Sequence, residues 1–419
     1  MQKIRSIKGT HDILPWDIHK WQKIESVLRE VFASYACKEV RTPVFESTNL
    51  FSRGVGEFSD IVSKEMYSFK DKGGDNLTLR PELTASVVRS YIQHNYQQES
   101  SLHKLWYFGP LFRQERPQAG RQRQFYQYGI ELIGSPHPEA DAESIDVACS
   151  VYRKLGLENW ELHINSIGSI EARKIYMNVL RDTLKDRKDE LCETCQGRFD
   201  GNILRLFDCK NSACQKIMKK HAPSILDHLS NEDKEHFKQV RKLLDAAGIK
   251  YIVNPALVRG LDYYTRTTFE IKGTALGAQD ALCGGGRYDN LISDLDGPET
   301  PAVGFAAGIE RLVMAMDAEQ LFDEDQNFVD LYVAPMDIAC LEGITPKVHE
   351  LRDKGFRIHI ELLRRSVKAM MRDANRQNAR WVAVIGEQEL QSGQLKLKNM
   401  QENDQVDVSL NEIEKIISK

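Results

Sequence analysis

The sequence predicts an α+β domain on a mostly antiparallel sheet, interrupted by a helical insertion and followed by a small α/β domain. Aromatic and β-branched runs recur on both sides of a charged helical stretch, a polar acidic segment follows, and strand-like and helical patterns then alternate. We expect the first domain at residues 1–325, its insertion at about 170–250, and the α/β domain at residues 326–419.

Composition excludes several classes of protein. A chain of 419 residues is too long for one compact core, and its formal net charge of −4 argues against a protein coated in nucleic acid. A net negative charge does not exclude local basic patches that bind RNA. No apolar run approaches the roughly 20 residues that span a bilayer, so we expect no membrane association. The N-terminal stretch MQKIRSIKGTHDILPWD has no apolar core of a signal peptide, which favours a cytoplasmic location.

The first half of the chain begins with a helix and continues into a hairpin. LWYFGPLFR (105–113) and FYQYGIELIG (125–134) read as two strands, joined by a loop that carries arginines at positions 113, 116, 121 and 123. Such a hairpin could hold polyphosphate or RNA. Residues 17–36 repeat apolar positions at helical spacing, and one face holds Trp21, Ile24, Leu28, Val31 and Phe32.

The second half alternates between charged helices and strands. Residues 170–247 predict the inserted helical module, after which YIVNPALV, LDYYTRTTFEI and CGGGRYD return to strand-like, Gly-rich sequence. GFAAGIERLVMAM predicts a strand that runs into a buried helix. The acidic segment 317–328 predicts a linker, and the remainder follows the β-α-β order of a small α/β domain.

Two arginines are candidates for phosphate binding. Arg113 offers a planar fork of donors suited to a phosphate or carboxylate, although a lone surface arginine paired with Glu115 is the alternative. Gly304 and Gly308 permit close backbone approach before Arg311, one turn into the predicted helix; tight packing is the alternative for this glycine pair.

Together these segments resemble the three signatures of class II aminoacyl-tRNA synthetases. VRTPVFE, which contains Pro43, is similar to motif 1; FRQERPQAGRQRQF is similar to motif 2; GFAAGIER is similar to motif 3. The resemblance implies that motif 1 builds a homodimer interface. It also implies that Arg113 binds the α-phosphate of ATP and that Arg311 lies near the adenine and γ-phosphate.

Two further peptides resemble those of histidyl-tRNA synthetases, namely LVRGLDYYTRTTFE (257–270) and LCGGGRYDNL (282–291). TLRPELTA is similar to the family's substrate strand, except that Leu83 stands where many relatives have glycine. The resemblance extends from KGTHDILP near the start to GEQELQSGQLKLKNM near the end. It implies a histidine–tRNA ligase that uses ATP, L-histidine and tRNA(His).

The resemblance also assigns roles to residues. Arg259 and Arg113 would be catalytic, with Arg259 at the substrate carboxylate and the α-phosphate. Because the histidine carboxylate is already an anion, no general base is required, and Mg²⁺ would arrive on the β- and γ-phosphates. The histidine-binding set would be Glu82, Thr84, Gln127, Glu131, Arg259, Tyr263 and Tyr264. For Tyr263 and Tyr264, packing in the core is the alternative to contact with the imidazole.

Two regions are candidates for tRNA binding. The first is the hairpin loop, through Arg116, Gln118 and Arg123. The second is a basic segment, residues 352–380, with nine Lys or Arg and three Asp or Glu, a local charge of +6. A solvated helix face is the alternative for this segment, but the resemblance implies anticodon binding. Its expected helical stripe consists of Arg365, Lys368, Arg372 and Arg376.

Four of the eight cysteines lie within the expected insertion, at positions 192, 195, 209 and 214. The pattern C-x2-C-x13-C-x4-C could place four thiolates around zinc. The second pair is widely spaced for such a site, so the sequence favours four reduced thiols, with zinc as the alternative.

Two other functions compete with a histidine–tRNA ligase. A non-catalytic regulatory paralogue that partners ATP phosphoribosyltransferase would retain the core, but such proteins typically lose the C-terminal domain and degrade the histidine peptides. A synthetase for another amino acid, such as threonine or proline, is disfavoured by RGLDYY and GGGRYD. Both peptides therefore favour the ligase.

Overall fold

The computed structural model describes residues 3–56, 61–118, 120–261, 263–277, 280–322, 329–402 and 404–418. The chain divides into two compact units, Met1–Phe322 and Asp323–Lys419. The expected linker begins inside helix α10 (Ile309–Ala318), where Asp317 pairs with Lys20 at 2.6 Å. The rest of that linker, residues 323–328, and with it the expected boundary at 325, lie outside the described residues.

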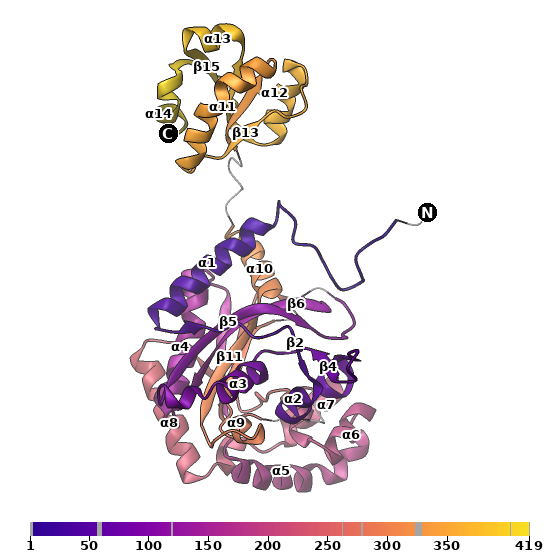
Figure 1. Cartoon of the computed structure of the whole chain (residues 1–419). Helices are drawn as coiled ribbons and strands as arrows, with labels where there is room; N and C mark the ends of the chain where they lie inside the picture. The colour runs from indigo at the N-terminus through magenta and orange to yellow at the C-terminus, as the bar shows by residue number, and fades with distance from the viewer. Residues whose placement is uncertain are drawn as a thin grey trace. The chain divides into compact units, whose positions relative to one another are not determined.

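An eight-stranded sheet forms the centre of the first unit (Figure 1). Its four longest pairings, β5–β6, β6–β11, β10–β9 and β9–β7, are antiparallel, and the short edge strands pair in parallel. This confirms the predicted mostly antiparallel sheet. In spatial order the strands are β1 (Lys38–Glu39), β5 (His103–Phe112), β6 (Gln124–Ile133), β11 (Ala302–Gly308), β10 (Ala281–Arg287), β9 (Thr265–Gly273), β7 (Trp160–Ser166) and β8 (Ile252–Val253).

Four helices cover one face of this sheet: α1 (Ile18–Ser34), α4 (Pro138–Lys154), α8 (Asn231–Ala246) and α10. The five apolar residues expected on one face of the first helix are all buried there, because their spacing places them toward the strands. The core of this face includes Tyr128 and Ile130 of β6.

The opposite face carries α3 (Thr84–Gln93) and most of the helical insertion. Every residue from 170 to 250 is described, and none lies in a strand. The insertion has no separate core, since α8 packs with α4 on the first face while α5 to α7 share a cluster with α3 and the sheet. Its elements are α5 (Ile170–Leu184), η3 (Lys185–Glu190), α6 (Glu193–Asp200), η4 (Ile203–Leu206), α7 (Ser212–His221), η5 (Ile225–His228) and α8.

A small three-stranded antiparallel sheet contains the segment that resembles motif 1. Its order is β2 (Phe45–Ser47), β4 (Asn76–Leu79), β3 (Tyr67–Lys70). Pro43 precedes β2, and its carbonyl accepts a hydrogen bond from Arg80 Nη1 at 3.2 Å. The remaining elements of the unit are α2 (Thr48–Val55), the π-helix η1 (Ile61–Glu65), η2 (Tyr96–Gln98) and α9 (Leu291–Asp294).

The second unit is the predicted small α/β domain. Helices α11 (Ile338–Asp353) and α14 (Ile413–Ile417) contribute to one core cluster, and α12 (Val367–Arg376) to another. Strands β12, β13 and β14 are parallel, as the β-α-β order requires, and two antiparallel strands follow. The five-stranded sheet has the order β13 (Ile358–Ile360), β12 (Val329–Pro335), β14 (Ala379–Ile385), β15 (Gln394–Asn399) and β16 (Gln405–Ser409), with α13 (Glu387–Ser392) and η7 (Leu410–Glu412) beside it.

The predicted basic stripe is wrong at its first residue. Helix α12 begins at Val367, so Arg365 lies before it and belongs to no helical stripe. Its guanidinium donates to Asp373 at 2.6 Å and to Glu361 at 3.1 Å. The spacing of the basic residues predicted a helix from Arg365, but the N-cap is Ser366 and the helix begins after it. The Arg365 side chain binds two carboxylates instead. Lys368, Arg372 and Arg376 lie on α12 and are exposed.

Within the described ranges, no helix is long and apolar enough to cross a bilayer.

Candidate active site

A cleft of about 430 Å³ opens on the sheet face that carries α3. Segments far apart in the sequence meet there: the turn before α3, the β5–β6 hairpin, residues 259–264, β10, and the β11–α10 junction. All seven residues expected to bind histidine line this cleft, together with Arg113 and Arg311. The sequence therefore identified residues that share one site.

Strand β6 supplies two of these side chains because its residues alternate between faces. Tyr128, Ile130 and Leu132 enter the core beneath α1 and α4, whereas Gln127 and Glu131 face the cleft. Gly304 on the neighbouring strand β11 makes room for this carboxylate, since a Cβ there would stand 1.9 Å from Glu131 Oε2.

Glu131 is a fully buried carboxylate at the floor of the cleft. It accepts hydrogen bonds from Thr84 Oγ1 at 2.7 Å, from Tyr107 Oη at 3.1 Å and from Tyr288 Oη. Burial disfavours the charged form and raises the pKa of Glu131 to about 8, although the three hydroxyl donors oppose this. A cationic ligand would hold it ionised at neutral pH.

Glu82 places a second carboxylate at the N-terminus of α3. It accepts from the backbone N–H groups of Thr84 and Ala85, both at 2.8 Å. Burial raises the pKa of Glu82, while these two N–H donors lower it. Leu83, between Glu82 and the helix, has φ −108° and is buried in the core, so this position needs no glycine.

Three tyrosines, Tyr263, Tyr264 and Tyr288, line the cleft, and a fourth, Tyr107, contacts Glu131 without lining it. The rings of Tyr263 and Tyr264 lie 4.7 Å apart between centroids, and Tyr288 stands edge-on to Tyr263 at 5.6 Å. Tyr107 and Tyr288 were missed by sequence reasoning, yet both hydroxyls bind Glu131. Tyr288 lies in the GGGRYD peptide, which was the available signal.

Arg259 enters the cleft beside the glycine run of β10. Its Nη1 donates to Glu270 Oε2 at 2.7 Å, and its Nε has no hydrogen-bond partner among the described residues. A Cβ at Gly284 would stand 1.8 Å from Arg259 Nη2, so only glycine admits this guanidinium. An unpaired buried donor of this kind is suited to an anionic ligand.

Arg113 and Arg311 are held mainly by neutral groups. Arg113 Nε donates to the carbonyl of Pro81 at 2.9 Å, and its guanidinium lies 5.2 Å over the ring of Phe125. Arg311 donates to the carbonyls of Gly120 at 3.0 Å and Ala281 at 2.8 Å. Arg113 does pair with Glu115, at 3.9 Å from Nη1 to the carboxylate, but the two side chains are 20% and 14% exposed and line the cleft, so this is not a surface pair. Carbonyls orient both arginines, and the ion pair between Arg113 and Glu115 is too long for a hydrogen bond.

The hairpin loop between β5 and β6 presents two of its three expected tRNA-binding residues to solvent. Arg116 and Gln118 are exposed, and the backbones of Gln118 and Arg121 exchange hydrogen bonds at 2.9 and 3.0 Å. Arg123 is half-buried at the base of the loop, where its backbone N–H donates to the carbonyl of Gly9 at 2.7 Å. The three residues are therefore not equivalent.

The four cysteines of the insertion also come together, outside this cleft. Their sulfur atoms lie within 4.8 Å of one another. The fold thus brings Cys209 and Cys214 close to the other two cysteines despite the wide sequence spacing of this pair.

Comparison with known proteins connects this geometry to a family. A sequence model described as histidyl-tRNA synthetase matches residues 9–312, and one described as anticodon binding domain matches residues 330–419. The chain belongs to the histidyl-tRNA synthetase family. The match to an anticodon binding domain also disfavours the regulatory paralogue, which typically lacks that domain.

Relatives within the family cover nearly the whole chain. A histidine–tRNA ligase of Caldanaerobacter subterraneus is 46% identical over 411 residues, which is 98% of each chain. One from Chloroherpeton thalassium is 48% identical over 410 residues, 97% of this chain and 96% of the relative. The crystal structure of apo histidyl-tRNA synthetase from S. aureus matches with a TM-score of 0.83 at 38% identity, over 100% of both chains.

Proposed function

We propose that this chain is a histidine–tRNA ligase that acts in two steps within the cleft. It joins L-histidine to ATP as histidyl-adenylate, releasing pyrophosphate, and then transfers the histidyl group to the 3′-terminal ribose of tRNA(His), releasing AMP. The observation that carries the proposal is the presence, in one cleft, of buried carboxylates and of arginines that backbone carbonyls orient.

The carboxylate side of the cleft would bind histidine. Glu82 and Glu131 would receive its α-ammonium, and Thr84 and Gln127, which line the same cleft, would assist them. Tyr263 and Tyr264 would surround the imidazole, whose donor and acceptor need polar partners. An analogue that lacks the imidazole donor and acceptor would leave the polar groups of the site unpaired. Such an analogue is rejected by several orders of magnitude.

The arginine side would bind ATP. Arg113 is proposed at the α-phosphate and Arg311 near the adenine and γ-phosphate. Arg259 would span the substrate carboxylate and the α-phosphate, so that the carboxylate oxygen attacks phosphorus in line. Its fixed guanidinium, with one free donor, stabilises the charge that develops on the phosphorus oxygens.

Magnesium would accompany the nucleotide. Glu310 lines the cleft, and the hydrogen bond that its carboxylate accepts comes from an uncharged group, the Tyr126 N–H at 2.9 Å. A hard oxygen donor of this type fits Mg²⁺, which is otherwise ligated by phosphate oxygens and water. When bound, the ion would neutralise charge on the β- and γ-phosphates.

RNA would be contacted from both units. In the first unit, Arg116, Gln118 and Arg123 of the hairpin loop would meet the acceptor end of tRNA. In the second unit, Lys368 and Arg372 expose their charges on α12 and would bind anticodon phosphates. Arg365 would serve this surface indirectly, because its charge is shared with Glu361 and Asp373.

A homodimer is also proposed, through the small sheet that follows Pro43. Strand alternation places Phe45, Tyr67, Phe69, Leu77 and Leu79 on one face, and Phe45 and Phe69 are 53% and 47% exposed. An apolar face of this kind fits a two-fold interface. Because tRNA and ATP are its substrates, we expect the protein to act in the cytoplasm.

Amino-acid-dependent exchange of pyrophosphate into ATP tests the proposal. The full chain is assayed with histidine, threonine, proline and a panel of other amino acids. Histidine alone should support exchange, and tRNA(His) should then be charged. Exchange with another amino acid would assign a different ligase. No exchange at all would favour the regulatory paralogue.

A further inference from the structure

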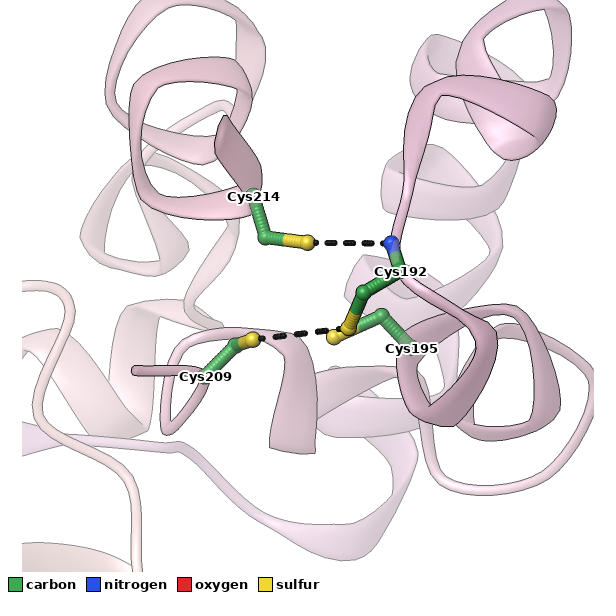
Figure 2. Close-up of side chains that lie close together, drawn as sticks. All are labelled: Cys192, Cys195, Cys209 and Cys214. Atoms are coloured by element: carbon green, nitrogen blue, oxygen red, sulfur yellow. Dashed lines mark hydrogen bonds between the residues drawn. The ribbon is translucent and has the colours of Figure 1, made fainter. Parts of the chain in front are cut away.

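Four cysteine side chains converge at one point of the insertion (Figure 2). Cys192 is the residue before α6, and Cys195 is in its first turn. Cys209 follows η4, and Cys214 is in the first turn of α7. Three of the four are buried and Cys192 is half-buried. Among the residues that the structure describes, this is the one group of His, Cys, Asp or Glu arranged to hold a metal ion.

We propose that these four cysteines bind one zinc ion as thiolates. A tetrahedral site with Zn–S bonds of about 2.3 Å requires sulfur atoms about 3.8 Å apart. The four sulfur atoms lie within 4.8 Å of one another, and those of Cys192 and Cys209 are 3.9 Å apart. Closing the set around an ion needs only small side-chain movements. Binding replaces the four S–H protons, which pass to solvent.

The spacing argues against two alternatives. A disulfide has sulfur atoms about 2.05 Å apart, and all four cysteines are free. An iron–sulfur cluster places several iron and sulfide atoms between its cysteine ligands, which needs a wider set than one ion does. A single metal ion is the occupant that fits.

Backbone donors already point at two of the sulfur atoms. The N–H of Cys192 donates to Cys214 Sγ at 3.2 Å, and the N–H of Asn211 donates to Cys209 Sγ at 3.4 Å. A neutral thiol is a weak acceptor, whereas a thiolate is a strong one. Hydrogen bonds of this kind orient the sulfur atoms and offset the negative charge of a four-thiolate site.

A zinc ion would stabilise a part of the insertion that is built of short elements. Between Lys185 and His228 the insertion consists of short helical elements, of which the longest, α7, has 10 residues. Helices this short are marginal in isolation and depend on tertiary packing or cross-links. The ion would join α6, the end of η4 and α7 at one point, over a loop of chain that no strand stabilises.

The cross-linked elements also form part of a second cavity, of about 800 Å³, next to Arg259. Arg198 of α6 and Arg205 of η4 line it, and Arg205 lines the active-site cleft as well. Zinc would therefore stabilise the part of the insertion, around α6 and η4, that lines the active-site cleft and the second cavity. It would not contact the substrates. Its loss should disturb this part of the insertion before it disturbs the sheet.

Metal analysis of the intact full-length protein tests the proposal. Cells are grown with both zinc and iron, and the purified chain is analysed by mass spectrometry of its metals. We expect about one zinc per chain and almost no iron. A mercurial that blocks thiols should release this zinc stoichiometrically. Replacement by Co²⁺ should give the intense visible bands of tetrahedral thiolate coordination.

Variants locate the ion. Cys209→Ser and Cys214→Ser should each lose most of the bound zinc and accelerate amide hydrogen exchange across residues 192–221. Cys340→Ser is the matched control, because Cys340 is equally buried but lies on α11 of the other unit. It should retain the full zinc content.

Three outcomes overturn the proposal. The first is a chain with less than about one tenth of a metal ion that takes up none when Zn²⁺ is added. The second is stoichiometric iron in place of zinc. The third is unchanged zinc in both serine variants, which would place the ion elsewhere. Because the first measurements use the unaltered protein, a variant that fails to fold does not decide the result.

Discussion

Cationic side chains gather in two regions of this chain, the cleft of the first unit and helix α12 of the second. In the cleft, Arg113 and Arg311 are half-buried and fixed by carbonyls, and Arg259 fits only because β10 has glycine at 284. On α12, Lys368 and Arg372 stand exposed on a single helix. The same residue types are rigid in one region and solvated in the other.

This difference indicates what each region can do. Fixed donors in a site with little water stabilise charge that develops during a reaction, since they need no reorganisation. Exposed cations on a helix attract a polyanion through counterion release, and single phosphate contacts contribute little each. The first region therefore suits adenylate chemistry, and the second suits binding of RNA.

Arg259→Ala should have the largest effect. Loss of one preorganised donor at developing charge typically costs about 10²–10³-fold in rate, or about 2.7–4 kcal/mol. Histidine-dependent exchange of pyrophosphate into ATP measures this. Arg53→Ala is the control, because Arg53 is an exposed arginine of the same unit that pairs with Asp296. If Arg259→Ala exchanges at the wild-type rate, Arg259 has no role in adenylate formation.

Glu131→Gln should abolish most histidine binding and yet stabilise the protein at alkaline pH. Burial raises the pKa of Glu131 from its usual value to about 8, so the folded state holds a proton that the unfolded state has lost. Wild-type stability therefore falls as the pH rises from about 4.5 to about 8, and the glutamine variant escapes this fall.

Melting curves at several pH values measure the effect. The advantage of Glu131→Gln over wild type should grow between about pH 5 and pH 8. Glu99→Gln, at an exposed position, is the control and should show no such trend. A constant difference across the range would contradict an ionisable, buried Glu131.

Arg365→Ala should destabilise the second unit by several degrees in melting temperature. The variant leaves Glu361, which is 3% exposed, without its main partner. Hydrogen bonding from Arg365 lowers the pKa of Glu361 to about 2, so this stabilisation is present above the unfolded pKa and is lost toward pH 2. The wild type and the variant should therefore converge in acid, as calorimetry would show. Equal melting at pH 7 would disprove the role.

The double change of Lys368 and Arg372 to alanine should have the smallest effect. It should weaken tRNA(His) binding and flatten its salt dependence by roughly 0.7 to 0.9 log units for each phosphate that is no longer neutralised. Exchange of pyrophosphate, which needs no RNA, should stay unchanged. Alanine preserves the helix. An unchanged salt slope would make this face of α12 merely solvated.

The sequence predicted secondary-structure elements and motifs better than it predicted which side chains contact one another. Residues such as Trp21 and Leu28 repeat at helical spacing, so their burial followed from periodicity alone. Tyr107 was missed because its contact with Glu131 depends on the pairing of β5 with β6, which spacing along one strand does not reveal.

Arg365 shows the opposite error. Its three-residue spacing from Lys368 looked helical, but a helix start is set by local capping, and α12 begins two residues later. The cysteines show a third limit: a gap of 13 residues says little about distance, because the chain folds back through η4 to bring Cys209 beside Cys192. Pairwise geometry of distant residues is the information that the sequence withholds.

The most direct test of the central claim is to identify the adenylate that the cleft makes. The full-length protein is incubated with Mg²⁺, ATP and an equimolar mixture of the twenty amino acids, and the species bound to it is determined by mass spectrometry. We predict histidyl-adenylate, in wild type and in the Lys368 and Arg372 variant alike, and its near absence in Arg259→Ala. Another aminoacyl-adenylate, or none in the wild type, would contradict the assignment of the cleft to histidine activation.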